Sequence, residues 1–207
     1  MAGPFSQKHV LLGVTGSIAA YKACEIASRL VEAGACVHPA LTESAGAFVG
    51  ATTLAAITSN RAVTAMFDPI QEPNIGHVAL ARRADLVLVA PATANILAKA
   101  AHGIADDWLS TTLLATRAPV LFAPAMNAAM YEHPATRANI ATLTERGCHF
   151  VGPGQGALAC GEEGPGRLMD TPAILEAAMV LLHGSKDLAW RKVLITSGAT
   201  HEAIDGV

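Results

Sequence analysis

The segment "HVLLGVTGSIAAYKACEIASRLVEAGA", residues 9–35, determines the class of fold. Residues 9–14 form a short apolar run that is typical of a strand buried on both faces. A glycine-containing turn follows. From residue 18 to residue 30 the apolar side chains recur at helical spacing, and Gly34 provides a C-terminal stop. The segment therefore predicts a strand, a tight turn and a helix.

The rest of the chain repeats this alternation. Apolar runs that predict further strands are separated by helical patterns, one of which divides into two pieces near Gly103. Residues 152–170 are rich in glycine and predict a long loop or irregular hairpin. The pattern indicates an α/β chain, a flavodoxin- or Rossmann-like doubly wound parallel sheet in a single domain. The predicted later strands are "CVHPALT" to Thr42, "DLVLVAPAT" to Pro91, "PVLFAPA" and "CHFVGPG".

Composition excludes several classes of protein. The chain is 52% hydrophobic and 15% charged, which is unlike a disordered chain. Its net charge is −3 and its basic residues are scattered, so we expect no nucleic-acid partner. We also expect no membrane span and no signal peptide, and hence a cytoplasmic protein. The apolar excess indicates a sheet buried on both faces, an oligomer interface, or both.

The four cysteines form no CxxC pair, so the sequence indicates neither a metal site nor a disulfide framework. Cys24 lies in a helical pattern, while Cys36 and Cys148 open strand-like runs. We expect these three to be small buried core residues. Cys160 instead lies in the glycine-rich loop, where a chemical role as proton donor or nucleophile is the better interpretation.

In a parallel α/β sheet, ligands bind beyond the carboxyl ends of the strands. Gly16 and Ser17 follow the first strand, and the amides and hydroxyl there can hold a phosphate or simply cap the helix. Thr42 and Ser44 follow the second strand and allow the same two interpretations. The turn lacks both the GxGxxG and the P-loop patterns.

Three further positions leave alternatives open. In "APATAN", residues 90–95, small residues would let a flat ring approach, whereas Asn95 could cap the next helix. His77 is either structural or an acid–base group. Asp106 and Asp107 resemble a metal or acid–base pair, but an N-cap and a first-turn acid are the better interpretation.

Asn127 raises the same question after the fourth strand. In "FAPAMNAAMYEHPAT", residues 122–136, its amide stands between two methionines. It either binds a ligand carboxylate or caps the helix that follows. We favour the carboxylate.

Taken in order, these motifs resemble the homo-oligomeric flavin-containing cysteine decarboxylases, with phosphopantothenoylcysteine decarboxylase as the nearest branch. "GVTGSIAAYKA" is similar to the FMN-phosphate turn, and residues 77–111 to the block with the catalytic histidine. "PATANI" is similar to the PASANT motif. "PAMNAAMY" matches PxMNxxMW except that Tyr131 replaces Trp, and "ACGEEGPGR" resembles the substrate-clamp loop.

The resemblance implies roles for named residues. It implies a catalytic set of His77, Asn127 and Cys160. The implied FMN contacts are Gly16, Ser17, Ile18, Thr42, Ser44, Phe48, Thr93, Ala94, Asn95, Ile96, Ala125 and, more weakly, Ser110 and Thr111. The implied substrate contacts are Met126, Asn127, Met130, Ala157, Leu158 and Ala159.

The implied reaction is the FMN-dependent decarboxylation of N-(4′-phosphopantothenoyl)-cysteine to 4′-phosphopantetheine in coenzyme A biosynthesis, a carboxy-lyase reaction. In this family the cysteine side chain is oxidised to a thioaldehyde, which is the electron sink for loss of CO2. The resemblance also implies a homo-oligomer built from trimers, which can assemble further, up to a dodecamer.

Residues 185–207 contain a polar stretch and then "VLITSGATHEAIDGV", which is similar to the opening strand of phosphopantothenate–cysteine ligase. We therefore expect a decarboxylase domain over residues 1–184, and a linker with the start of a ligase-like domain behind it. The alternatives are a peptidyl-cysteine decarboxylase, a flavin prenyltransferase and a non-catalytic flavin-binding regulator. The ligase-like tail and Cys160 argue against the first, the PAMN motif against the second, and the complete His/Asn/Cys set against the third.

Overall fold

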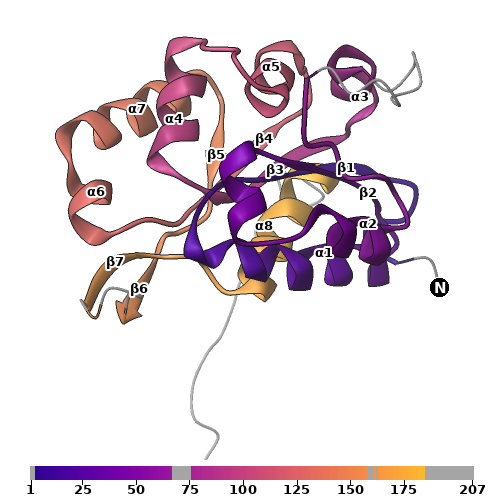
Figure 1. Cartoon of the computed structure of the whole chain (residues 1–207), viewed down its shortest axis with the longest axis horizontal. Helices are drawn as coiled ribbons and strands as arrows, with labels where there is room; N and C mark the ends of the chain where they lie inside the picture. Colours follow the sequence, from indigo (N-terminus) through magenta and orange to yellow (C-terminus); the bar gives the residue numbers. More distant parts are fainter. Residues whose placement is uncertain (1–2, 67–75, 158–160, 162, 185–207) are drawn as a thin grey trace, which may run out of the picture.

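A five-stranded parallel sheet forms the centre of the computed structural model, which describes residues 3–66, 76–157, 161 and 163–184 (Figure 1). The strand order is β2-β1-β3-β4-β5, which is the flavodoxin order. The prediction of a parallel α/β sheet is therefore confirmed. The strands are β1 (His9–Val14), β2 (Cys36–Leu41), β3 (Leu86–Ala92), β4 (Val120–Pro124) and β5 (His149–Phe150).

Helices cover both faces of the sheet (Figure 1). On one face lie α1 (Lys22–Glu32), α2 (Ala51–Thr58) and α8 (Thr171–His183). On the other lie α3 (His77–Arg83), α4 (Ala94–His102), α5 (Trp108–Ala115) and α7 (Pro134–Glu145). The remaining short helices are η1 (Ile18–Tyr21), η2 (Glu43–Ala47) and α6 (Ala128–Glu132).

Two hydrophobic cores lie on opposite sides of the sheet because successive strand residues point to opposite faces. Leu12 and Leu88 belong to the core beneath α1 and α8, and Leu11 and Val87 to the core beneath α4 and α5. Every residue of β3 is buried. A sheet buried on both faces thus accounts for part of the apolar excess in the composition.

An antiparallel hairpin of β6 (Gly154–Ala157) and β7 (Glu163–Arg167) follows the sheet. It confirms the irregular hairpin expected from the glycine-rich segment. None of the helices among the described residues combines the length and the apolar character that crossing a membrane requires. Residues 185–207 lie outside the described residues, so the domain boundary near residue 184 stays a prediction.

Some local expectations need correction. Within residues 48–60 the helix is α2, which begins after Gly50. Cys24, Cys36 and Cys148 are free thiols, but each is only partly buried. Cys24 and Cys148 pack at the margins of the two cores, and Cys36 lies at the start of β2.

Candidate functional site

The carboxyl ends of β1 and β3 form the centre of the candidate site. The chain leaves β1 toward β2 on one side, while β3 continues the sheet on the other, so the strand order reverses here. Thr15, only 2% exposed, joins the two ends. Its hydroxyl donates to the Pro91 carbonyl oxygen at 2.7 Å and accepts from the Thr93 amide at 3.1 Å.

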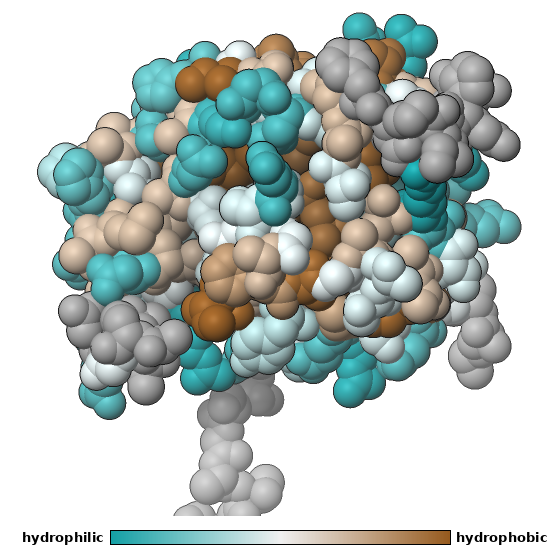
Figure 2. Space-filling model, in the orientation of Figure 1, coloured by the Kyte–Doolittle hydropathy of each residue, from teal (hydrophilic) through white to brown (hydrophobic). Residues whose placement is uncertain are grey.

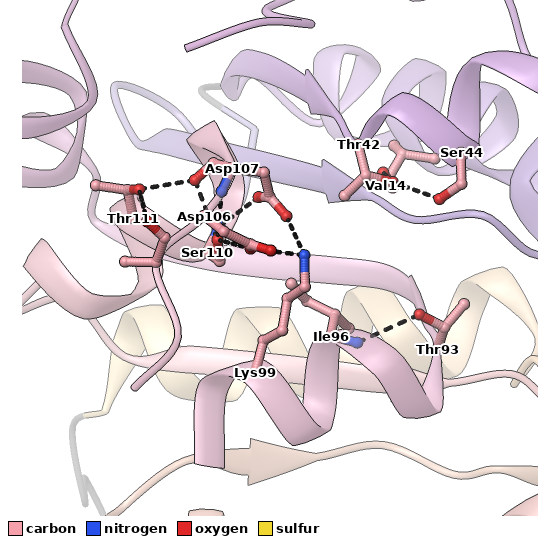
Figure 3. A network of polar contacts seen from close by, with 11 residues as sticks. Val14, Thr42, Ser44, Thr93, Ile96, Lys99, Asp106, Asp107, Ser110 and Thr111 are labelled. Carbon is pink, nitrogen blue, oxygen red and sulfur yellow. Dashed lines mark hydrogen bonds and ion pairs between the residues drawn. The ribbon is translucent and has the colours of Figure 1, made fainter. Parts of the chain in front are cut away.

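The turns after β1 and β2 also touch each other. A Cβ atom on Gly16 would lie 2.5 Å from Ser44 Oγ and 3.1 Å from the Ser44 carbonyl carbon, so only glycine fits. The hydroxyls of Thr42 and Ser44 lie 3.3 Å apart (Figure 3). The hydroxyl groups of Thr42 and Ser44 therefore lie next to the Gly16 turn, beyond the carboxyl ends of β1 and β2.

Helix caps account for part of these polar residues. Ser17 Oγ accepts a long bond from the Ala19 amide at 3.3 Å, and Thr93 Oγ1 accepts from the Ile96 amide at 3.4 Å. The cap of α4 is thus Thr93, and Asn95 lies inside the helix. The idea that Asn95 caps this helix is wrong, because Thr93 already occupies the extended position at which a side chain can reach back.

These turns enclose an open cavity of about 500 Å³. Five of the thirteen residues that the sequence indicated for FMN line it. The cavity also contains charged residues that sequence reasoning did not assign to the site. The lining residues are Thr15, Thr42, Glu43, Ser44, Thr93, Asn95, Ile96, Lys99, Asp106 and Asp107.

Lys99 is the principal residue that the sequence did not single out. Its Nζ lies 2.7 Å from Asp106 Oδ1 and 2.9 Å from Asp107 Oδ2 (Figure 3). Burial lowers the pKa of Lys99, but the hydrogen bonds and charges of the two aspartates outweigh it and raise that pKa overall. The Lys99 hydrogen bond in turn lowers the pKa of Asp106. Lys99 lies one turn after Asn95 on α4. Because residues four positions apart lie on the same face of a helix, this spacing from Asn95 could have predicted that Lys99 belongs to the site.

The two aspartates stabilise the start of α5. Asp107 is the N-cap: its Oδ1 accepts from the Ser110 amide at 2.8 Å, and Ser110 Oγ accepts from the Asp107 amide at 3.0 Å. The N-cap interpretation is confirmed for Asp107. Asp106 precedes the cap instead of lying in the first turn. Thr111 Oγ1 donates to the Asp107 carbonyl at 2.7 Å, so Ser110 and Thr111 both take part in this cap.

Charge limits what can hold an anion here. Glu43, Asp106 and Asp107 outnumber the single cation Lys99 around the cavity. Among the described residues, a phosphate would therefore depend on hydroxyls and backbone amides, since the one lysine is already engaged by two carboxylates. The turn that contains Gly16 and Ser17 provides such groups.

A second group of predicted residues lies on the turn after β4. The Ala125 amide donates to the Ala92 carbonyl at 3.0 Å, which joins this turn to the end of β3. Asn127 caps α6, and its Oδ1 accepts from the Ala129 amide at 2.8 Å. A carboxylate would instead need an N–H donor, so the cap and the predicted ligand contact use different atoms of the same amide.

The hairpin is fastened to this turn. The Met126 amide donates to the Gly166 carbonyl at 3.0 Å. A Cβ on Gly166, whose φ is +143°, would lie 2.1 Å from the Met126 carbonyl oxygen. Ala157 ends β6. Cys160, Leu158 and Ala159 fall on the connection between β6 and β7 and lie outside the described residues.

The remaining predicted residues are dispersed. His77 begins α3 and is half-buried, and it is not among the residues that line the cavity. Phe48 is 45% exposed, Ile18 60% and Met130 50%. Apolar surface is visible in the middle of the face shown in Figure 2. Within the described part of one chain, the predicted catalytic and flavin residues therefore do not close into a single pocket.

Comparison with known proteins identifies the family of the chain. The model of the family described as "Flavoprotein" matches residues 3–183. The chain belongs to the flavoprotein family. A curated relative, the coenzyme A biosynthesis bifunctional protein CoaBC of Vibrio cholerae, is 46% identical over 200 residues, which are 97% of this chain and 50% of the relative. This flavoprotein thus spans about half the length of the curated relatives it matches.

Solved structures agree with this fold. The FMN-dependent cysteine decarboxylase SpaF is 37% identical, with a TM-score of 0.70, over 84% of this chain and 99% of its own. A cysteine-to-serine mutant of PPC decarboxylase, complexed with pantothenoylaminoethenethiol, is 27% identical, with a TM-score of 0.73, over 89% of this chain and 99% of its own. The family and the fold that the motifs indicated are therefore confirmed.

Proposed function

We propose that this flavoprotein decarboxylates N-(4′-phosphopantothenoyl)-cysteine to 4′-phosphopantetheine with FMN, as a carbon–carbon lyase of coenzyme A biosynthesis. The observation that carries the proposal is the cavity at the β1/β3 switch point, where the hydroxyl residues Thr15, Thr42, Ser44 and Thr93 line it at the ends of the first three strands of the chain. The similarity to CoaBC and to PPC decarboxylase selects this substrate among cysteine derivatives.

The residues fit FMN in chemistry and in space. The close approach of Gly16 to Ser44 leaves a turn of bare backbone beside two hydroxyls, which suits a phosphate. Thr93 and Ala94 at the start of α4, with the buried Ala125 opposite, present small side chains to a flat ring. Ile18 and Phe48 would cover apolar parts of the ring, and their exposure agrees with that role. Ser110 and Thr111 are weaker candidates because the α5 cap engages them.

The chemistry that bound FMN supplies is reversible two-electron oxidation, which makes the cysteine side chain a thioaldehyde and so provides a sink for the electrons left by CO2. The protein must hold the substrate carboxylate in one orientation while this happens. We assign that role to Asn127, whose side-chain N–H can donate to a carboxylate without neutralising it. Its Oδ1 remains on the Ala129 amide, so the cap fixes the side chain.

Proton transfers require an acid–base group and a proton donor. We assign the first role to His77, which starts α3 with its side chain half-buried. Removal of the thiol proton during oxidation is a task to which imidazole is suited at neutral pH. We assign the second role to Cys160, which would protonate the enethiolate carbon in the final reduction. Met126, Met130 and Ala157 would contact the substrate chain.

The dispersal of these residues over one chain supports an oligomeric site. We infer that His77 and Asn127 meet FMN at contacts between subunits of a homo-oligomer built from trimers, which can assemble further. The exposed apolar side chains Ile18, Phe48 and Met130 would then be covered by FMN or by a neighbouring subunit. We further propose that residues 185–207 are a linker and the start of a ligase-like domain, and that the enzyme acts in the cytoplasm.

A choice of substrates tests the proposal. A peptidyl-cysteine decarboxylase is the second candidate, because the 37% identity to SpaF, an FMN-dependent cysteine decarboxylase, supports a cysteine substrate without specifying what the cysteine is attached to. The FMN-loaded protein is given phosphopantothenoylcysteine or a peptide that ends in cysteine, and loss of CO2 is followed by mass spectrometry. We expect turnover of the first substrate alone. Turnover of the peptide alone would replace the proposed substrate by a peptide.

A further inference from the structure

A second cluster of reactive side chains lies at the amino ends of β1 and β2, opposite the strand ends where FMN is proposed to bind. His9 begins β1, Cys36 begins β2, and His38 follows two residues later on the same face of that strand. His9 and Cys36 are paired across the two parallel strands. One ligand atom from each of the three side chains lies within 4.8 Å of the other two. Six-residue strands place this cluster about 20 Å from the carboxyl edge where FMN is proposed to bind.

We propose that His9, Cys36 and His38 bind a single zinc ion through His9 Nδ1, Cys36 Sγ and His38 Nε2, with water in the fourth position. The described residues include no other such group of three or more His, Cys, Asp or Glu side chains. Two imidazoles and one thiolate form a ligand set that Zn²⁺ prefers over Mg²⁺ or Ca²⁺.

The distances between ligand atoms fit a tetrahedral ion. His9 Nδ1 lies 3.1 Å from His38 Nε2, and Cys36 Sγ lies 3.5 Å from the same nitrogen. Tetrahedral zinc with bonds of about 2.0 Å to nitrogen and about 2.3 Å to sulfur needs edges of about 3.3 Å and about 3.5 Å. The two ring planes lie within 22° of each other, so the rings need only tilt for their lone pairs to converge on one point.

The surroundings determine how zinc would enter. All three side chains are partly exposed, which provides a path from solvent. Asn60 Nδ2 lies 3.7 Å from Cys36 Sγ and also donates to the Val37 carbonyl at 2.9 Å, which supports the thiolate from a fixed position. Without metal, the two imidazoles share one hydrogen between the nitrogens that would bind zinc.

Arg83 opposes metal binding in a way that can be tested. Its Nε donates to His9 Nε2 at 3.4 Å, which requires the hydrogen of that ring to be on Nδ1. Zinc binding would move this hydrogen to Nε2, release the Cys36 proton to solvent and displace the Arg83 side chain. Asp85, whose Oδ2 accepts from the His9 amide at 2.8 Å, partly offsets the added positive charge.

The surroundings of the two imidazoles lower the pKa of each ring. Burial, and then the charge of Arg83, lowers the pKa of His9, although Asp85 raises it. Burial, His9 and Arg83 together lower the pKa of His38 to about 4.

Zinc content measured on the FMN-loaded chain tests the proposal. The protein is stripped with a chelator, equilibrated with Zn²⁺, desalted and assayed for zinc and flavin. We expect one zinc per chain, and at least tenfold weaker binding in Cys36→Ser and in His38→Gln. Cys148→Ser changes a partly buried thiol outside the cluster and should bind zinc like the unaltered chain. Repeating the assay in Cys160→Ser excludes zinc held by that thiol.

Two further measurements distinguish loss of the zinc site from a folding defect. Arg83→Ala should bind zinc roughly tenfold more tightly, because one unfavourable charge and one competing hydrogen bond are lost. Co²⁺ should give tetrahedral d–d bands at wavelengths beyond flavin absorption, and these should disappear in Cys36→Ser. Absence of zinc from the unaltered chain, or equal zinc in Cys36→Ser, would show that the cluster is only a hydrogen-bonded contact.

Discussion

Gly166 of the hairpin and Met126 of the turn after β4 are in such close contact that no side chain fits between them. A Cβ on Gly166 would lie 2.1 Å from the Met126 carbonyl oxygen, while the Gly166 carbonyl accepts from the Met126 amide at 3.0 Å. Through this contact β7 is fixed beside the turn that contains Asn127. The position of the hairpin relative to Asn127 therefore depends on one glycine.

Gly166→Ala should separate the hairpin from the Asn127 turn and lower turnover at least tenfold, while FMN remains bound at the other turns. The matched control is Gly154→Ala on the same hairpin, where a Cβ would meet its nearest atom at an ordinary 3.5 Å. Steady-state kinetics and flavin content are measured for both. Equal turnover in the two variants would mean that the contact is not needed for catalysis.

Gly16→Ala should weaken FMN binding, because its Cβ would lie 2.5 Å from Ser44 Oγ. This collision would push the turn after β1 away from the turn after β2, and both turns are proposed to hold the FMN phosphate. We expect protein that loses flavin on gel filtration. Gly46→Ala, two residues from Ser44 and with nothing within 4 Å of its Cβ, is the control and should remain yellow. Full retention of flavin by Gly16→Ala would remove this turn from the cofactor site.

Asn127→Asp separates the two roles of this side chain. A carboxylate can still accept from the Ala129 amide, so α6 should keep its cap. It cannot donate to the substrate carboxylate and would repel it, so we expect turnover to fall about a hundredfold or more with FMN retained. Turnover within a few-fold of the unaltered chain would leave capping as the role of Asn127.

Lys99→Met should lower the thermal midpoint at neutral pH, because Asp106 and Asp107 lose their shared cation. The sign with pH follows from Asp106, because Lys99 holds the pKa of this carboxyl in the folded chain below its usual value of 3.8. Its contribution is present above pH 3.8 and is lost as the pH falls through the lower folded value. Thermal melts of both proteins should therefore converge in acid, and a constant difference would contradict the pairing.

The sequence was sufficient for the fold because its strands are short apolar runs that end in glycine and hydroxyl residues. It also indicated half of the residues that line the cavity, since ligand groups follow strand ends in a parallel sheet. Lys99 was missed because its partners, Asp106 and Asp107, precede the first turn of the next helix, and only tertiary packing brings them to Lys99. The His9–Cys36–His38 cluster was missed for the same reason: strand register, not sequence spacing, creates it.

The central claim is tested most directly by the mass of the product formed from phosphopantothenoylcysteine. The unaltered FMN-loaded chain should yield 4′-phosphopantetheine, which requires both loss of CO2 and the final reduction. Cys160→Ser should release CO2 but accumulate the oxidised enethiol, since its proton donor is missing. Unconverted substrate with the unaltered chain would contradict the proposed function, and complete conversion by Cys160→Ser would remove Cys160 from the mechanism.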